Sequence, residues 1–271
     1  MNYRIENGKN LVKIRTNGGV SYLLMEKPIS IIWADCQGSI GQLFTLTKYS
    51  SEKRISIIEE LNLKVYKNYE NELEITDDFL ELLQLFESGD YSIEFFNKYQ
   101  IEQDSQLMLL FNKKLVMTNK LLFEETKIQI SNLANDRALD YISTEFQLDY
   151  SYKSNDTLMF TRPFESIDLD RVAFFENEIK QGKKPFAIIL SKEYDLAKGN
   201  TRHFWCSGNF ILDGHHKLLA YNNLKIEPPI LKITHLLNEV DGEKVNIKDL
   251  EEVLLPNHIA RIKYYSLCDY D

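Results

Sequence analysis

The residues best suited to chemistry stand together in one short segment, Asp213-Gly214-His215-His216-Lys217. The apolar residues before it predict a strand, and the residues after it predict a helix that begins within the segment. The first amides of a helix lack partners inside the helix and, together with the helix dipole, favour an anion. Gly214 would let the backbone approach a phosphate closely, because glycine has no side chain. His215, His216 and Lys217 add donors and positive charge, so the segment predicts a phosphate-binding turn.

Asp213 adds an oxygen ligand to this turn. Its carboxylate could hold a substrate hydroxyl, orient a histidine or bind Mg2+. The alternative is that Asp213-Gly214 is an ordinary turn and that the two histidines are solvated residues at the helix cap. Five residues make a short motif, and their chemistry alone leaves both interpretations open.

The elements that must position this turn lie in residues 162–233. The spacing of Leu169, Val172 and Ile179 predicts a helix that ends near Gly182. The run after Pro185 is apolar and of strand length, which is typical of a buried strand. The other predicted elements are strands over 186–190, 203–206 and 209–212, a helix over 215–223, and a strand over 230–233 after two prolines.

This ordered set resembles the ParB/sulfiredoxin-type domain over residues 162–233, about a quarter of the chain. The resemblance is carried by Ile179-Lys180-Gln181-Gly182-Lys183-Lys184-Pro185, by residues 209–220 and by Pro228-Pro229-Ile230. Sulfiredoxins have a reactive cysteine in the turn and partition ParB proteins have Gly-Glu-Arg-Arg, and this turn has neither. It is closest to the Asp-Gly-His-His-Arg branch, which includes free serine kinases. Lys217 stands where that branch has arginine, and lysine lacks the fork of a guanidinium.

The resemblance implies a phosphotransferase or NTP hydrolase that uses ATP or ADP with Mg2+ and acts on a small hydroxyl substrate. It also implies a catalytic carboxylate before the first helix of the unit, where it could accept the hydroxyl proton. Glu165 is the first choice and Asp168 the second, although Asp168 could simply cap that helix. Arg162 could contact a phosphate or form a surface ion pair.

A metal site is a weaker alternative. His203, Cys206, Asp213 and His215 are all acceptable zinc ligands. The first two stand three residues apart on an expected strand, which sends their side chains to opposite faces. No metal site is therefore predicted from these residues.

The composition limits the partners of the chain. Its net charge of -9 does not attract nucleic acid, because binding a phosphate backbone needs clustered lysine and arginine. The cysteines Cys36, Cys206 and Cys268 are far apart, which indicates a reduced, cytoplasmic protein without a disulfide framework. No apolar window reaches the roughly 18 residues of a membrane helix, so no membrane partner is expected.

The first 120 residues carry no catalytic motif. Their patterns predict strands over 11–15, 20–24, 29–33 and 43–48, helices over 51–61 and 75–86, and a hairpin over 107–117. We expect an α/β (α+β) chain with an N-terminal mixed α/β domain at residues 1–150, which is free to bind a protein partner. The C-terminal ParB/sulfiredoxin-like domain would occupy residues 151–271. The alternatives for function are a non-catalytic ParB-like binding or interaction module and a ParB-like nuclease.

Overall fold

The computed structural model confirms that the chain mixes helices and strands. It describes residues 1–17, 20–34, 40–46, 56–57, 77–99, 141–147, 158–159, 161–162, 167–194, 209–237, 247–251, 256 and 259–260. The predicted hairpin at 107–117, the strand at 203–206, Glu165 and most of the helix at 51–61 lie outside these residues. None of the helices described in these ranges is long and apolar enough to cross a membrane.

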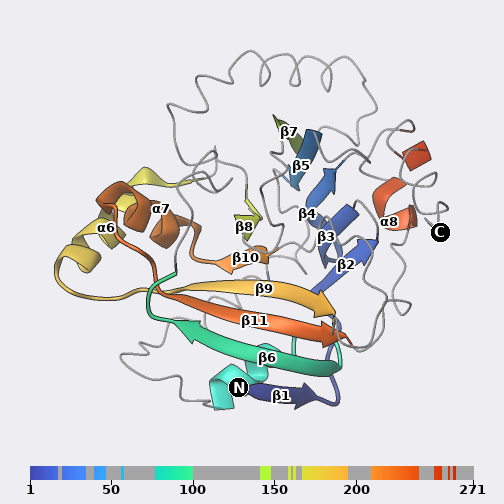
Figure 1. Ribbon diagram of the computed structural model, residues 1–271, viewed down its shortest axis with the longest axis horizontal. Coiled ribbons are helices and arrows are strands. Elements are labelled where there is room, and N and C mark those ends of the chain that lie inside the picture. The colour runs from blue at the N-terminus through green and yellow to red at the C-terminus, as the bar shows by residue number, and fades with distance from the viewer. Residues whose placement is uncertain are drawn as a thin grey trace.

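A six-stranded sheet holds the predicted turn (Figure 1). Its strands, in spatial order, are β1 (Asn2–Ile5), β6 (Gly89–Phe96), β11 (Ile230–Leu237), β9 (Ala187–Tyr194), β10 (Asn209–Asp213) and β8 (Leu158–Met159). The sheet is mixed, because β9 pairs parallel with β11 and antiparallel with β10. The predicted strands at 186–190, 209–212 and 230–233 are confirmed as β9, β10 and β11, with slightly different ends.

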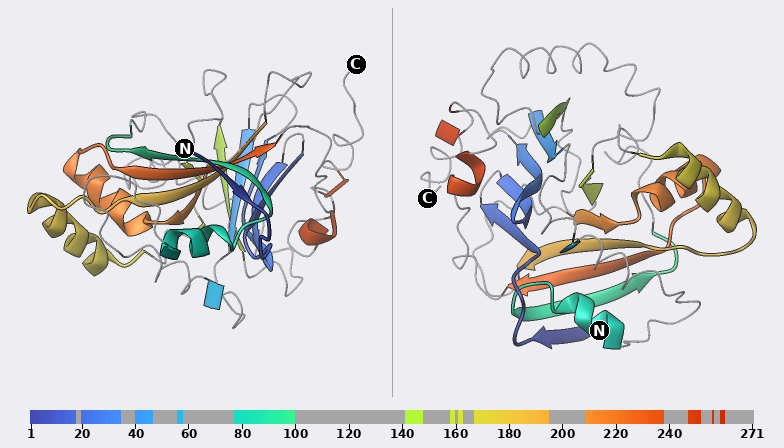
Figure 2. Two further views of the ribbon diagram at one scale, coloured as in Figure 1. Left: turned by 90° about the horizontal axis from the view of Figure 1, so that it is seen from below. Right: turned by 180° about the vertical axis from the view of Figure 1, so that it is seen from behind.

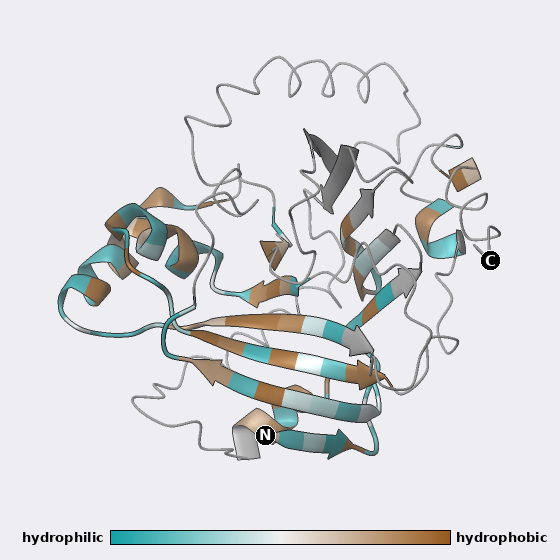
Figure 3. Cartoon of the chain, viewed as in Figure 1, coloured by the Kyte–Doolittle hydropathy of each residue, from teal (hydrophilic) through white to brown (hydrophobic). Residues whose placement is uncertain are grey.

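The central strand β9 begins with the apolar run predicted from the sequence. Residues 187–190 are all buried, and they colour the first half of β9 brown in Figure 3. A strand with neighbours on both sides and apolar residues on both faces is typical of a sheet centre. Pro185 precedes the strand, where its missing N–H removes no ladder hydrogen bond.

Two helices pack together at one end of this sheet, α6 (Leu169–Lys180) and α7 (His215–Leu224) (Figures 1 and 2). Both helices were predicted from the sequence and are confirmed. The predicted apolar stripe of α6 is buried at Val172, Phe175 and Ile179. The helices therefore cover the end of the sheet at which β10 turns into α7.

A second, antiparallel sheet of five strands lies at the other end of the molecule (Figure 2). Its order is β2 (Lys13–Asn17), β3 (Val20–Met25), β4 (Lys27–Ala34), β5 (Ile40–Leu46) and β7 (Tyr141–Gln147). Two short helices complete the described elements, α2 (Asp77–Leu83) and α8 (Ile247–Glu251). The predicted strands of the first 50 residues and the core of the helix at 75–86 are confirmed.

The expected boundary near residue 150 does not separate the two sheets. The strands β1 and β6 belong to the first segment, yet β6 pairs along β11 from Ile230 to Leu236 and extends the sheet that carries the turn. One continuous core also contains Leu23 of the second sheet and Ile189 of the first. The division of the chain into two domains stays a prediction.

Candidate functional site

The sharp turn between β10 and α7 is present as predicted. The strand ends at Asp213, Gly214 has a left-handed backbone with φ 106°, and α7 begins at His215. A Cβ atom on Gly214 would lie 2.7 Å from Cβ of Ala187, the first residue of β9. Glycine is therefore required here by its backbone and by the closeness of β9, in addition to any approach of a phosphate.

Among the residues that the structure describes, no side chain caps the start of α7. The N-cap residue is Gly214, which has no side chain to accept hydrogen bonds from the amides of the first turn. Most helices satisfy some of these amides with a serine, threonine, aspartate or asparagine. The amides at the start of α7 are therefore suited to an oxyanion.

His215 is buried, at 4% exposure, and fixes the segment before α6 to the turn. Its Nε2 accepts a hydrogen bond from the Thr161 amide at 3.2 Å, and the Thr161 hydroxyl donates to the carbonyl of Ile211 at 2.6 Å. Burial, and then the positive charge of Arg162, hold the pKa of His215 well below its ordinary value of 6.5. His215 is therefore a neutral residue of the core at neutral pH.

His216 joins the starts of the two helices. It is 8% exposed, and its Nε2 accepts a hydrogen bond from the Asp168 amide at 3.1 Å. Burial and the charges of Arg162 and Arg171 lower the pKa of His216, against the opposing effect of two nearby carboxylates. A neutral imidazole whose Nε2 accepts must carry its proton on Nδ1, which leaves Nδ1–H as a donor. The alternative of solvated cap histidines is wrong for both residues, because both side chains are buried.

Lys217 and Asp213 pair with each other. The Lys217 ammonium lies 2.6 Å from a carboxylate oxygen of Asp213 and donates to the Phe186 carbonyl at 3.0 Å. The lysine side chain is 8% exposed and the aspartate side chain 18%. The structure thus brings both predicted residues to the turn, with the charge of each compensated by the other.

Asp168 caps α6. Its Oδ1 accepts hydrogen bonds from the amides of Asp170 at 2.9 Å and Arg171 at 3.3 Å. The carboxylate thus makes the capping contact that the sequence analysis kept as an alternative to a catalytic role. Glu165, the preferred catalytic carboxylate, lies among residues that the structure does not describe.

Arg162 belongs to the segment that His215 joins to the turn. It is partly buried and directly follows Thr161, which is hydrogen-bonded to His215. Its charge acts on both histidines of the turn. No ion-pair partner of Arg162 is seen among the described residues, and both the phosphate contact and the surface ion pair stay predictions.

Sequence reasoning missed three contributors to this site. Thr161 supplies the partner of His215, Arg171 adds positive charge beside His216, and the Phe186 carbonyl accepts from Lys217. The position of Arg171, three residues after the cap of a predicted helix, could have indicated a role near the helix start. The other two contacts join residues 54 and 31 positions apart, which no local pattern reveals.

The described residues do not form a ready site for a metal. No group of three histidine, cysteine, aspartate or glutamate residues converges among them. The two carboxylates near the turn are engaged, Asp213 by Lys217 and Asp168 by the α6 amides. They supply no open set of oxygen ligands of the kind that Mg2+ requires.

A phosphate fits the described residues better than a metal ion does. The α7 amides, the Nδ1–H of His216 and the guanidinium of Arg162 are donors of the kind that bind phosphate oxygens.

Comparison with protein-family models, with curated proteins and with solved structures found no match for the chain. The resemblance to the ParB/sulfiredoxin-type domain stays a prediction, and a function must be argued from the turn itself.

Proposed function

We propose that the turn between β10 and α7 binds a phosphate group of ATP or ADP, and that the chain is a nucleotide-dependent phosphotransferase or NTP hydrolase. The acceptor would be a small hydroxyl compound or water. The observation that carries the proposal is the start of α7, where the N-cap residue is the glycine Gly214, near Arg162 and a neutral His216. This combination offers backbone amides, one imidazole donor and a cation to a single oxyanion.

The local charge supports an anionic ligand despite the acidic composition. The chain has a net charge of -9, yet the charges that lower the pKa of His216 are those of two arginines. The hydrogen bond from the Asp168 amide to His216 also brings the starts of α6 and α7 together. Both helix dipoles present their positive ends in this region, and such ends stabilise negative charge.

The chemistry that we assign to His216 is the donation of a hydrogen bond. With Nε2 occupied by the Asp168 amide, Nδ1–H is the proton available to a phosphate oxygen. A lowered pKa keeps this imidazole neutral, so it orients the phosphate without adding a full charge. Deprotonation of the acceptor hydroxyl requires a separate carboxylate, for which Glu165 is our candidate.

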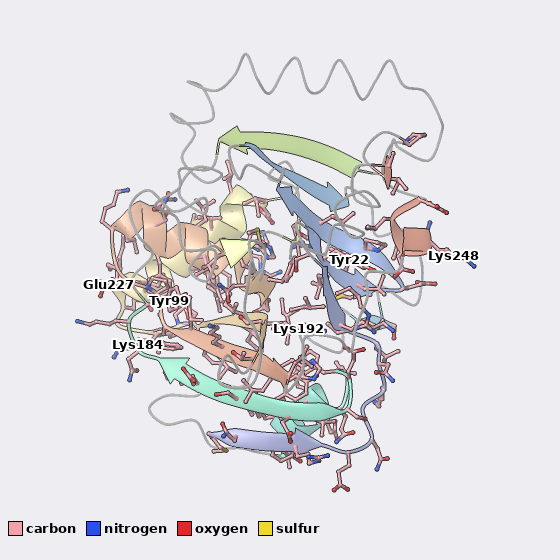
Figure 4. All side chains as sticks on the ribbon, turned by 45° about the vertical axis from the view of Figure 1, so that its right-hand side comes forward. Tyr22, Tyr99, Lys184, Lys192, Glu227 and Lys248 are labelled. Atoms are coloured by element: carbon pink, nitrogen blue, oxygen red, sulfur yellow. The ribbon has the colours of Figure 1, made fainter. Side chains whose placement is uncertain are left out.

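The proposal is tested by measuring ATP, ADP and CTP binding and turnover. We expect H216A and R162Q each to weaken ATP binding about tenfold or more, because each removes a charged or charge-assisted hydrogen bond of roughly 1.5–3 kcal/mol. K184A is a control, since Lys184 is an exposed lysine of the loop before β9 (Figure 4). Equal affinities for all four proteins would contradict the proposal.

A second candidate function has an observation of its own. Lys217 pairs with Asp213, and both histidines accept hydrogen bonds from backbone amides of the chain. The turn is thus largely satisfied from within, as in a non-catalytic ParB-like interaction module. This module would bind no nucleotide, and its thermal stability would not change when ATP, ADP or CTP is added.

A further inference from the structure

Lys217 is enclosed in the protein. Its ammonium lies 5.9 Å from the ring centroids of both Phe175 on α6 and Phe186 before β9. It also donates to the Phe186 carbonyl and to Asp213, which stands at the end of β10. A lysine held by two rings, a carbonyl and a carboxylate is oriented toward the inside of the corner.

The negative charge of Asp213 would weaken binding of the proposed ligand. It directly precedes the N-cap residue of α7, and its side chain keeps 18% exposure. An uncompensated carboxylate there would repel an oxyanion at the first amides of the helix, since like charges at a few ångströms interact strongly where water is sparse. The Lys217 ammonium at 2.6 Å offsets this charge.

We propose that Lys217 is a positioning residue that neutralises Asp213 and fixes the corner, and that it does not itself contact the phosphate. This inference rests on the proposed function. The other cations near the turn are Arg162 and Arg171, whose charges act on His216. The lysine at the position of the family's arginine therefore acts through Asp213.

The test is a double-mutant comparison of pyrophosphate binding by calorimetry, at a temperature far below unfolding. K217M exposes the ligand to an unpaired Asp213 carboxylate, and we expect roughly a tenfold loss of affinity. D213N/K217M removes the repulsion as well as the ammonium, so its affinity should return to within about threefold of the native protein. K183M, which removes an exposed lysine, serves as the control for loss of one charge.

A direct phosphate contact by Lys217 predicts a different pattern. In that case D213N/K217M stays at least as weak as K217M, and this result would overturn the proposal. The affinities of the native protein and of the double variant distinguish a direct phosphate contact from a role through Asp213, even where K217M alone fails to fold. They do so because the double variant leaves no buried charge unpaired.

The salt dependence of binding supplies a readout that loss of structure would not move. Salt screens a charge that attracts the ligand, so removing such a charge makes the affinity less sensitive to salt. The affinity of R162Q for pyrophosphate should therefore change less with salt concentration than that of the native protein. The affinity of D213N/K217M should change with salt as much as that of the native protein. An affinity of the double variant that hardly changes with salt would also overturn the proposal.

Absence of pyrophosphate binding by the native protein would instead refute the proposed function, together with this inference.

Discussion

Two independent constraints require glycine at position 214. Its φ of 106° is strained for any residue with a side chain, and an added Cβ would lie 2.7 Å from Cβ of Ala187. We expect G214A to lower the free energy of unfolding by roughly 2–4 kcal/mol, from strain and overpacking together. Urea denaturation of the native protein and the variant measures this difference.

Gly182 provides the matched control. It also has a positive φ, 89°, but an added Cβ would meet nothing within 4 Å. G182A should therefore cost only the backbone strain, roughly 1 kcal/mol. Equal losses for the two variants would show that the contact with Ala187 contributes nothing.

His215 should make the stability of the protein sensitive to acid. Its pKa is lowered by burial and by Arg162, so the unfolded chain binds a proton at a higher pH than the folded one. The neutral imidazole contributes fully to the stability of the protein when the pH is above 6.5, the ordinary pKa of histidine. This contribution is lost as the pH falls below that value toward the lower pKa of the folded protein. Thermal unfolding from about pH 8 to about pH 5 should show a falling midpoint, with a smaller fall in H215N.

At the residue scale the sequence revealed which side chains gather but not how they pair. Asp213, His215, His216 and Lys217 were found because they adjoin a glycine between a strand and a helix. The partners of the two histidines come from other segments, as Thr161 and the Asp168 amide show. Burial turned the histidines inward, and a local motif carries no information about burial.

At the scale of elements, α6 depends on its cap. Asp168 accepts two amide hydrogen bonds, and its own amide bonds to His216 of α7. D168A should lower the free energy of unfolding by about 1 kcal/mol through loss of the cap, with the amide contact retained. D170A, on the first turn without a capping bond, should cost less in the same denaturation experiment. A larger loss for D170A would contradict the assigned cap.

The helices and strands around the turn were accessible from the sequence because their signals are local. The strand β9 follows Pro185 as an apolar run, and α6 begins after a capping aspartate. The irregular pairing of β10 with β9 between Ile211 and Asp213 has no such signal. It lies where the chain leaves the sheet for α7, next to the close approach of Gly214 to Ala187.

At the scale of the molecule, a buried polar joint connects the two sheets. Arg15 of β2 binds Glu87 with two hydrogen bonds of 2.8 and 2.6 Å. The buried Lys192 of β9, labelled in Figure 4, donates to the Ile14 carbonyl at 2.9 Å. E87Q should cost roughly 3 kcal/mol of unfolding free energy, because it removes the negative charge that Glu87 places beside a mostly buried guanidinium.

The exposed ion pair of Arg4 and Asp90 serves as the control for the buried pair of Arg15 and Glu87. Its side chains are 71% and 41% exposed, so D90N should change the unfolding free energy by less than about 1 kcal/mol. Chemical denaturation of both variants measures the contrast. A cost for E87Q no larger than that for D90N would show that the joint adds little.

The same joint predicts a response to strong acid. Burial raises the pKa of Glu87, but the hydrogen bonds and charge of Arg15, with Lys192 and His235, bring it below its ordinary value of 4.5. The stabilisation is therefore complete above that value and is lost as the pH falls through the lower, folded pKa. The stability difference between the native protein and E87Q should shrink between about pH 6 and about pH 3. A difference independent of pH would contradict this assignment.

The arrangement of the whole molecule was the part least accessible from the sequence. The pairing of β6 with β11 joins residues about 140 positions apart, and β7 joins a sheet whose other strands lie within the first 50 residues. Such long-range pairings depend on which apolar faces meet, and a single sequence does not encode this locally. An expected boundary at residue 150 could not anticipate that one sheet draws strands from both sides of it.

The central claim is that the amides at the start of α7 hold an oxyanion. The most direct measurement is a titration of the 15N-labelled protein with pyrophosphate, followed by amide resonances. We predict that the amides of His215 and His216 shift most, with smaller shifts at Arg162 and Asp168, and that R162Q weakens the response. Resonances of α7 that stay in place while the protein is saturated, or shifts confined to other elements, would contradict the account.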